Sequence, residues 1–488
     1  MLGHPKGLYV LFMTEMWERF SFYTMRAILV LYLVSVVFAD MAGGAQVIRD
    51  RALEVYGTYL LLVYLSGLVG GFFADKVLGS RKAIFTGGIV MGTGLFVMME
   101  PSLVFYGLGL VIAGNGFFKP NISTIVSGLY EEGDKRRDGA FTIFYMGINI
   151  GAFLAIFSAG YAEKINNWNL GFVIAGIGMI VSLMVFAAGQ KYLGTAGFPP
   201  RRTVTAETRL TGRDVRDILI WATVMIALVL GVVFLWNHGL APLWAKIPGV
   251  VKLVAGILLI LGALGGFVAV NHDNTREEWE RIISIVILSL FVIFFWAGFE
   301  QAGGTMNLFA YEQTDRRFFG WEIPATWFQG VNPLFIVLLA PLFSMLWNRL
   351  DRSRFALSTP AKMGVGMIVL GLGFVVMYVG EGVAEQYGKA GMGWLIAVYL
   401  LHTMGELCLS PIGLSMVTKL SPVRRVSLMM GVWFACTAVA DYLSGRMEAI
   451  THALDLNLWA TLIATSIGAG ALLLSLTPLL KRWMHGRA

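Results

Sequence analysis

The stretch that decides the fold is Glu15-Met-Trp-Glu18-Arg19-Phe20-Ser-Phe22-Tyr23-Thr-Met-Arg26. It lies within an apolar segment that runs from about Leu8 to Phe38. A helix rises 1.5 Å per residue, so these roughly 30 residues would cover about 45 Å, which is enough to cross a bilayer with some tilt. The sequence therefore predicts four charged side chains at membrane depth.

Helical spacing places these charges on one face. The positions i, i+3, i+4, i+7 and i+11 hold Glu15, Glu18, Arg19, Phe22 and Arg26. Charges inside a bilayer are costly unless they pair or face water, so a functional site is the first interpretation. The alternative is an ion-pair network that only helps helices pack. This alternative is disfavoured because a packing network would need fewer than four charges. The fourth charge, on Arg26, also requires an acidic partner elsewhere in the chain.

The composition is that of a membrane protein. Of 488 residues, 57% are hydrophobic and 14% are charged, whereas about 25% are charged in an average globular chain. We predict fourteen spans, the first too long and too charged for a cleavable signal peptide. Cys408 and Cys436 lie within spans, which indicates buried thiols rather than a disulfide or a metal cluster. The approximate span centres are Tyr23, Val63, Gly92, Ala113, Gly151, Gly178, Met225, Leu259, Phe295, Val337, Gly371, Thr403, Ala438 and Gly468.

Orientation explains the net charge of +7 better than nucleic-acid binding does. With fourteen spans and a cytoplasmic N-terminus, 25 of the 37 Lys and Arg residues fall on the cytoplasmic side, 9 fall outside and 3 lie within the membrane. This asymmetry follows the positive-inside rule. We therefore expect both termini in the cytoplasm, a lipid bilayer around the chain and no nucleic-acid partner.

Three further motifs follow in the first half of the chain. The second span ends in Gly71-Phe-Phe-Ala-Asp75-Lys76-Val-Leu-Gly79-Ser-Arg81-Lys82, whose charges either clamp neighbouring helix ends or form a plain basic loop. The fourth span holds Phe118-Lys119-Pro120-Asn121-Ile-Ser123, where a lysine is costly and the proline frees a backbone carbonyl. The fifth span reads Phe141-Thr-Ile-Phe144-Tyr145-Met-Gly-Ile-Asn149-Ile-Gly151-Ala-Phe153.

These motifs, in this order, resemble the proton-dependent oligopeptide transporter family of the major facilitator superfamily. The resemblance covers essentially the whole chain and starts with Glu-x-x-Glu-Arg-Phe on the first helix. One departure stands out. The family pattern ends in Tyr-Tyr-Gly, whereas this chain has Phe22-Tyr23-Thr24, so the hydrogen bond of the first family tyrosine is lost here.

The resemblance implies an all-α membrane protein with the major facilitator fold, in which two six-helix bundles rock about a site at the midplane. We expect an N-terminal bundle over residues 1–189 and a C-terminal bundle over residues 276–488. Between them, residues 190–275 form a basic cytoplasmic linker and two extra transmembrane helices, near 217–236 and 249–270, of the kind that bacterial members carry. These two spans hold no charge at membrane depth, so we give them no part in transport chemistry.

The second half adds polar groups at membrane depth in Trp296-Ala-Gly-Phe-Glu300-Gln301, in Asn332-Pro333 and in His402-Thr-Met-Gly-Glu406. His402 and Glu406 are four residues apart, but two ligands are weak evidence for a metal, so we favour a hydrogen bond or tuning of a pKa. Asp441 follows Trp433-Phe-Ala-Cys-Thr437, and it either lines the cavity or caps a packing contact.

Bases gather in the first half and acids in the second, which suits a zwitterion with separated ends. Lys119 and Arg26 are candidates to hold a carboxylate, and Glu406 is a candidate for an ammonium group. Asparagines suit a peptide backbone, and aromatic residues suit varied side chains. The resemblance assigns the peptide site to Tyr23, Arg26, Tyr64, Lys119, Asn149, Trp296, Glu300, Asn332, Glu406, Trp433 and Thr437. It assigns proton coupling to Glu15, Glu18, Arg19, Lys119 and Glu300.

Buried opposite charges must pair with each other when substrate is absent. The candidate pairs across the bundles are Lys119 with Glu406 and Arg26 with Glu300. The resemblance adds Arg49 with Glu312 as an external latch, although both could also be solvated loop charges.

These features predict a monomeric proton-coupled symporter that imports di- and tripeptides by alternating access across an inner (plasma) membrane. The proton is the coupling ion, and we expect no other cofactor and no metal. One alternative keeps the fold but carries an amino acid, nitrate or a drug, and another is a peptide sensor without net transport. An enzyme is disfavoured because the spans hold no Ser–His, His-rich or Cys–His cluster.

Overall fold

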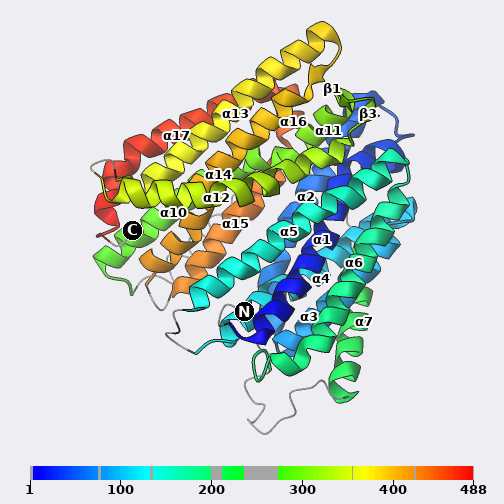
Figure 1. Ribbon diagram of the computed structural model, residues 1–488, viewed down its shortest axis with the longest axis vertical. Helices are drawn as coiled ribbons and strands as arrows, with labels where there is room; N and C mark the ends of the chain where they lie inside the picture. Colours follow the sequence, from blue (N-terminus) through cyan, green and yellow to red (C-terminus); the bar gives the residue numbers. More distant parts are fainter. Residues whose placement is uncertain are drawn as a thin grey trace.

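The computed structural model describes residues 4–74, 78–131, 134, 136–198, 212–235, 273–353, 356–422 and 425–486. This part of the chain is almost wholly helical (Figure 1), because a backbone in a bilayer must satisfy its own hydrogen bonds. The first half contains α1 (Lys6–Tyr32), α2 (Gly44–Phe73), α3 (Ser80–Val97), α4 (Val104–Gly128), α5 (Arg136–Lys164), α6 (Trp168–Gly189) and α7 (Gly212–Leu235). The second half contains α10 (Arg276–Phe299), α11 (Thr305–Glu312), α12 (Val331–Asp351), α13 (Thr359–Tyr387), α14 (Met392–Leu420), α15 (Val426–Ser444), α16 (Met447–Ala453) and α17 (Leu458–Trp483).

Thirteen of the fourteen predicted span centres lie on described helices. The centre at Leu259, the predicted span 249–270, and Asp75 and Lys76 of the second motif lie outside the described residues. In the described part, nine helices are long and apolar enough to cross a membrane. A tenth span results if Leu428–Ser444 and Met447–Ala453, which meet at 54°, count as one bent span. Helices α2, α3 and α7 are also long, and each carries charged residues near its beginning.

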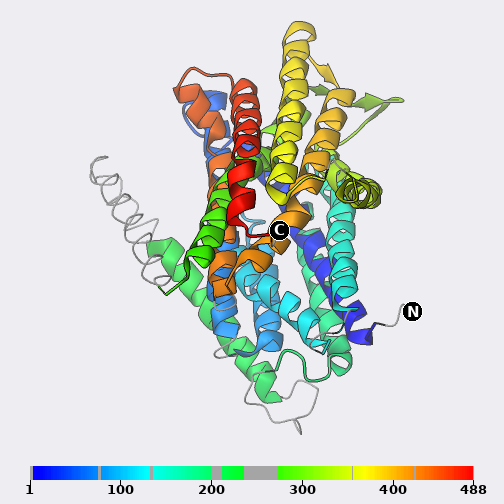
Figure 2. The same cartoon turned by 90° about the vertical axis from the view of Figure 1, so that its left-hand side faces the viewer.

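The helices form two halves, each with its own hydrophobic core (Figure 1). One core draws mainly on α1 to α6, and the other draws on α10 to α17. Figure 2 shows α7 against the outside of the first half, where Lys82 Nζ and Asp217 Oδ2 lie 2.8 Å apart. The all-α major facilitator class expected from the sequence is confirmed, while the bundle boundaries at residues 189 and 275 stay predictions.

Close helix packing in the first half depends on glycine. Pro120 inside α4 cannot donate a hydrogen bond to the carbonyl of Gly116, and that carbonyl lies against Gly70 of α2. A Cβ on Gly70 would stand 2.0 Å from the Gly116 oxygen. A Cβ on Gly151 of α5 would likewise stand 2.2 Å from the carbonyl oxygen of Met16 on α1. The first contact packs α4 closely against α2, and the second packs α5 closely against α1.

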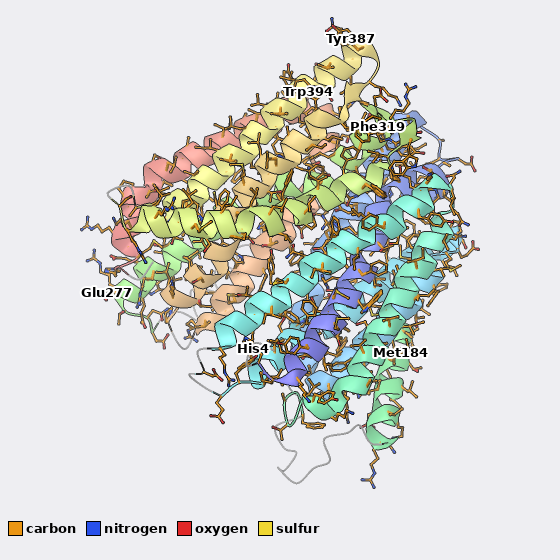
Figure 3. The ribbon with its side chains drawn as sticks, in the orientation of Figure 1. His4, Met184, Glu277, Phe319, Tyr387 and Trp394 are labelled. Atoms are coloured by element: carbon orange, nitrogen blue, oxygen red, sulfur yellow. The ribbon has the colours of Figure 1, made fainter. Side chains whose placement is uncertain are left out.

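The two halves are joined at the end of the molecule that carries the β2–β3 hairpin, which we call the hairpin end. Phe319 and Tyr387 mark this end in Figure 3, and His4 and Glu277 mark the opposite end, where both chain termini lie (Figures 1 and 3). A Cβ on Gly57 of α2 would stand 2.8 Å from the Cα of Gly445, which directly follows α15. Asn307 Nδ2 and Gln329 Nε2 both donate to the carbonyl of Ala27, at 3.0 and 3.3 Å.

Short strands cap the hairpin end. Strand β2 (Arg317–Phe318) pairs antiparallel with β3 (Trp321–Glu322), and β1 (Thr314–Asp315) pairs in parallel with β4 (Ala390–Gly391). The two residues between β2 and β3, Phe319 and Gly320, have φ angles of 48° and 78°. Two positive φ angles in a two-residue loop are typical of a type I′ turn, which the twist of the strands favours.

Candidate functional site

A polar cavity of about 200 Å³ lies between the two halves at membrane depth. One wall comes from α1, α2, α4 and α5, and the other comes from α10, α12, α14 and the 3₁₀ turn Glu300–Gly303 that follows α10. The predicted site residues that line it are Arg19, Tyr23, Arg26, Tyr64, Lys119, Asn149, Trp296, Glu300, Asn332 and Glu406. Residues far apart in the sequence therefore meet in one chamber.

The charged face of α1 forms a compact cluster beside this cavity. Glu15, Glu18 and Arg19 are all buried. The Arg19 guanidinium group donates to both carboxylate oxygens of Glu18, and its Nη2 lies 2.6 Å from Glu18 Oε1. Arg19 Nε also lies 3.3 Å from Glu15 Oε1. The second oxygen of Glu15, Oε2, has no hydrogen-bond partner among the described residues. Glu18 is thus fully engaged, while Glu15 keeps one buried oxygen free.

Lys119 faces the cavity from α4. Its Nζ lies 4.8 Å from the centre of the Tyr64 ring, a cation–π contact. The structure gives it no carboxylate within 4.0 Å among the described residues, although it interacts electrostatically with Glu15 and Glu18. The predicted pair of Lys119 with Glu406 is therefore not formed here, because Lys119 rests on Tyr64 while Glu406 is bound by its own half.

Arg26 bridges the two halves. Its Nη2 contacts Glu300 Oε2, and its Nε donates to Tyr56 Oη at 2.8 Å. This places the second predicted pair, Arg26 with Glu300, at the centre of the molecule and on the cavity wall. The phenol of Tyr56, which sequence reasoning missed, fixes the orientation of the guanidinium group.

Glu406 lies across the cavity from the basic residues. Asn332 Nδ2 donates to Glu406 Oε2 at 2.9 Å and to Thr403 Oγ1 at 3.0 Å. The structure therefore joins two predicted site residues, Asn332 on α12 and Glu406 on α14. His402, one turn before Glu406, packs edge-on against Phe374 with ring centroids 4.6 Å apart. The described residues contain no group of three potential metal ligands.

The aromatic residues divide into two groups. Tyr23 and Trp296 line the cavity, as does Phe22, whose ring stacks near Tyr59 with centroids 6.4 Å apart. Trp433 and Thr437 are buried on α15 and do not line it: Thr437 Oγ1 donates to the Trp433 carbonyl at 3.2 Å. Their place in the peptide site stays a prediction. Tyr145, Gln329 and Tyr399 line the cavity without having been predicted.

The hairpin end carries charged contacts between the halves. Arg49 contacts Glu312 and lies 3.1 Å from Glu448 Oε1, so it holds two acids of the second half. On α5, Glu163 accepts hydrogen bonds from Arg316 Nη1 at 3.1 Å and from the backbone amides of Ala325 and Thr326, at 2.7 and 2.9 Å. Glu448 and Glu163 were missed because they lie at helix ends, where the sequence gives no sign of which distant group they meet.

Two helical halves around a charged cavity at membrane depth define an alternating-access transporter. The chain belongs to the POT family, whose model matches residues 81–463. This membership makes the protein a membrane transporter and not an enzyme, as the sequence predicts.

Similar proteins support this assignment over the whole chain. The peptide transporter YePEPT of Yersinia enterocolitica is 36% identical, over 98% of this chain and 95% of the relative. The di-/tripeptide transporter of Lactococcus lactis subsp. cremoris is 34% identical, over 92% and 90%. The crystal structure of a peptide transporter POT with sulfate matches with a TM-score of 0.80 at 34% identity, over 100% and 97%. A POT family transporter with 5-aminolevulinic acid matches with a TM-score of 0.80 at 30% identity, over 98% of both chains.

Proposed function

We propose that this protein is a proton-coupled symporter that imports di- and tripeptides by alternating access. The observation that carries the proposal is the charge pattern of one cavity. Arg26 and Lys119 stand on the wall of the first half, and Glu406 stands on the wall of the second. A free peptide carries a carboxylate and an ammonium group at separate ends, so it complements both walls at once.

The binding mode follows from these groups. The peptide carboxylate binds Lys119 and Arg26, and the ammonium group binds Glu406. Asn149 and Asn332 offer donors and acceptors to the peptide backbone, whose chemistry does not depend on the side chains. The ligand of one similar structure, 5-aminolevulinic acid, also has an amino group and a carboxyl group at separate ends. Tyr23, Trp296 and Phe22 provide apolar wall for varied side chains.

Proton coupling uses the acids that compete for the same cations. While Glu300 is ionised it holds Arg26, and a proton on Glu300 would free Arg26 for the peptide carboxylate. In the α1 cluster, Glu15 is the better proton carrier, because its Oε2 is buried without a donor while both oxygens of Glu18 bind Arg19. Proton and peptide thus load as a pair. The proton neutralises the acid, and the peptide carboxylate then pairs with the arginine that the acid has released, so no buried charge is left without a partner.

The orientation follows from the basic residues. Both termini lie at the end opposite the hairpin (Figure 1), and the excess of basic residues on that side supports a cytoplasmic position for it. The hairpin end then faces outward across a bacterial inner membrane. With its contacts formed, this structure corresponds to the state that is closed to the outside. We propose that the protein works as a monomer in the lipid bilayer with protons as the coupling ion.

The energy of one proton is sufficient for a scavenging importer. Moving one charge through about 100 mV releases roughly 2.3 kcal/mol, and a pH difference of one unit adds about 1.36 kcal/mol. The sum of about 3.7 kcal/mol supports several-hundred-fold accumulation of a neutral zwitterion. No ATP-binding site is needed.

The test is uptake of labelled dialanine by proteoliposomes under an imposed potential and an inward proton gradient. We expect accumulation that a dipeptide and a tripeptide compete away, and that alanine, nitrate and N-acetylated dialanine leave unchanged. Competition by alanine or nitrate instead of peptides would assign a different cargo to the same fold. Binding of dialanine without accumulation would identify a sensor.

A further inference from the structure

The contact between α2 and α15 at the hairpin end buries an acid that the transport scheme leaves unused. We call this contact the seam, and Gly57 of α2 meets Gly445 within it. Asp441 lies one helical turn before Gly445 on α15, and its exposed fraction is 1%. It is not among the residues that line the polar cavity.

One carboxyl oxygen of Asp441 has no hydrogen-bond donor in the described part of the chain. Its Oδ2 is buried without a hydrogen-bond partner among the described residues. Its backbone carbonyl accepts from Ser444 Oγ at 2.8 Å, but that bond belongs to the helix end and does not involve the side chain. Of the two roles that the sequence left open for Asp441, lining the cavity is not what the structure describes, and a role in helix packing stays a prediction.

Four other acids of the seam and its surroundings each have a cation. Glu448 and Glu312 contact Arg49, and Glu54 lies 2.8 Å from Arg446 across the seam. Glu300 contacts Arg26. Asp441 stands apart, because no described lysine or arginine nitrogen lies within 4.0 Å of it.

The groups that face Asp441 come from each neighbouring element. It interacts electrostatically with Glu300, with Arg26 on α1 and with Lys119 on α4. On α2, both Tyr56 and Tyr64 interact electrostatically with Asp441. Arg26 is already held by Glu300 and Tyr56, and Lys119 rests on the Tyr64 ring, so neither base is free to pair with Asp441 here.

A buried carboxylate without a donor or a cation is unfavourable, and at membrane depth the neutral acid is the form that can stay. We propose that Asp441 is a proton-linked residue of the outer gate: the seam closes only when Asp441 is protonated, and it opens when Asp441 ionises. The inference rests on the proposed function only in taking the hairpin end as the outer face.

The proton balance of this step is simple. As the seam closes, an Asp441 carboxylate oxygen takes one proton from a hydronium ion in the external water. An O–H bond of the hydronium ion breaks, a carboxyl O–H bond forms, and the resulting water leaves the seam. When the seam opens, water returns and receives that proton. Asp441 thus gates the cycle and adds nothing to the charge moved per peptide, which separates its role from those proposed for Glu15 and Glu300.

The sign of the pH effect follows. Closure binds one proton, so low external pH favours the closed seam and rising pH favours the open one. With one linked proton, the ratio of open to closed molecules rises by at most about tenfold per pH unit. An asparagine resembles the protonated acid in shape and cannot ionise, so Asp441→Asn should stay closed at every pH.

The experiment measures the distance between spin labels on Ala45→Cys and Tyr387→Cys, two exposed positions at the hairpin end of opposite halves. Cys408 and Cys436 are replaced by alanine, and the full chain is held in nanodiscs without peptide. From about pH 5.5 to about pH 8.5 we expect the long-distance population to rise in the parent protein and to stay low in Asp441→Asn. The exposed acid Asp134 does not contribute, because hydrogen bonds from the Arg136 side chain and backbone lower its pKa to about 2.

Two outcomes would overturn the proposal. In the first, the distance distribution of the parent protein does not change with pH. In the second, the distance distribution of Asp441→Asn changes with pH as much as that of the parent. Glu54→Gln is the matched control. It removes a seam acid that has a cation, so it should raise the open population at every pH and keep the pH response.

Infrared difference spectra give a second, independent measurement. At low pH the parent protein should show a protonated carboxyl band that is absent in Asp441→Asn and shifted in Asp441→Glu. If Asp441 is ionised in the closed state, that band is missing and the proposal fails. Neither measurement uses peptide, so failure of dialanine uptake would refute the proposed function while leaving this result unaffected.

Discussion

The two glutamates of α1 differ in how completely they are bonded, and this difference predicts their roles. Both oxygens of Glu18 bind Arg19, whereas Oε2 of Glu15 is buried without a donor. A proton on Glu18 would break bonds to an arginine, while a proton on Glu15 would remove an unmatched charge. The structure thereby separates two residues that spacing alone treats alike.

We expect Glu15→Gln to lose proton-driven accumulation of dialanine yet to keep peptide exchange, because glutamine mimics the protonated acid. Glu18→Gln should lose accumulation and slow exchange as well, since it also weakens the hold on Arg19. Liposome uptake under an imposed potential, compared with counterflow at zero potential, separates the two. If accumulation survives in Glu15→Gln, Glu15 does not carry the coupling proton and Glu300 alone would carry it.

A second prediction concerns Glu406. Its Oε2 accepts from Asn332 at 2.9 Å and faces the cavity, so it is available to an ammonium group. We expect Glu406→Gln to weaken dialanine binding by roughly 2–5 kcal/mol, the range for losing one member of a buried charge pair. N-acetylated dialanine, which has no ammonium group, is the matched ligand and should lose little further affinity. Equal losses for the two ligands would contradict the assignment.

At the scale of residues, the sequence predicted which side chains belong to the site better than it predicted which residues on other helices bind them. The helical period of α1 placed four charges on one face, and the paired acids and bases indicated a zwitterion site. Tyr56, which binds Arg26, and Glu448, which binds Arg49, could not be predicted. Their partners lie on other helices, and helical spacing within one segment contains no information about which distant face it meets.

At the scale of elements, the contact between α2 and α15 depends on two glycines. A Cβ on Gly57 would stand 2.8 Å from the Cα of Gly445, closer than real side chains approach a backbone. The two helices would have to separate to admit it. Since the halves meet here, the separation would act on the outer gate rather than on folding within one half.

We therefore expect Gly57→Ala to raise the open population at the hairpin end and to slow counterflow, while the protein still folds. Spin-label distances between the halves measure the population. The control is Gly468→Ala on α17, where a Cβ meets nothing within 4 Å. That change should leave the distances unaltered and slightly stabilise its helix, by roughly 0.5–1 kcal/mol. Unchanged distances in Gly57→Ala would show that α2 and α15 can accommodate the added methyl group without opening the outer gate.

The β2–β3 hairpin supports a second prediction for an element. Phe319 has a φ of 48° and an exposed fraction of 95%, so a bulky residue occupies a position that suits asparagine or glycine. We expect Phe319→Asn to stabilise the hairpin by roughly 1 kcal/mol, because a left-handed conformation costs an L-residue about 1–2 kcal/mol. Slower hydrogen exchange of the hairpin amides would show this. Phe318→Asn, within β2, is the control and should not slow exchange.

Elements were predictable where the bilayer dictates them. Long apolar runs must become helices in a membrane, so thirteen predicted span centres fall on described helices. The small strands escaped prediction because each has only two residues, too few for a period. The bend of 54° between α15 and α16 also escaped prediction, since no proline marks it in the sequence.

For the whole molecule, most charged contacts between the halves that the described residues form gather at the hairpin end, while the pair of Arg26 with Glu300 lies at the cavity. Arg49 holds Glu312 and Glu448, and Arg316 holds Glu163. An alternating-access cycle must break these contacts to expose the cavity to the outer side. Their combined strength therefore sets the balance between the two states, and the protein needs that balance to be close, because a gate that never opens cannot load substrate.

The last prediction tests this balance. Arg49→Ala leaves two acids without their cation, so the closed state should lose roughly 1–3 kcal/mol relative to the open state, and the ratio of open to closed molecules should rise about 5- to 150-fold. Arg51→Ala is the control, because Arg51 pairs with Glu54 three residues along the same helix and does not reach the second half. Adding Glu448→Gln to Arg49→Ala should restore part of the closed population, since it removes one unmatched charge. If Arg49→Ala and Arg51→Ala gave equal distance distributions, the contacts of Arg49 would be incidental, and the seam glycines alone would hold the outer gate closed.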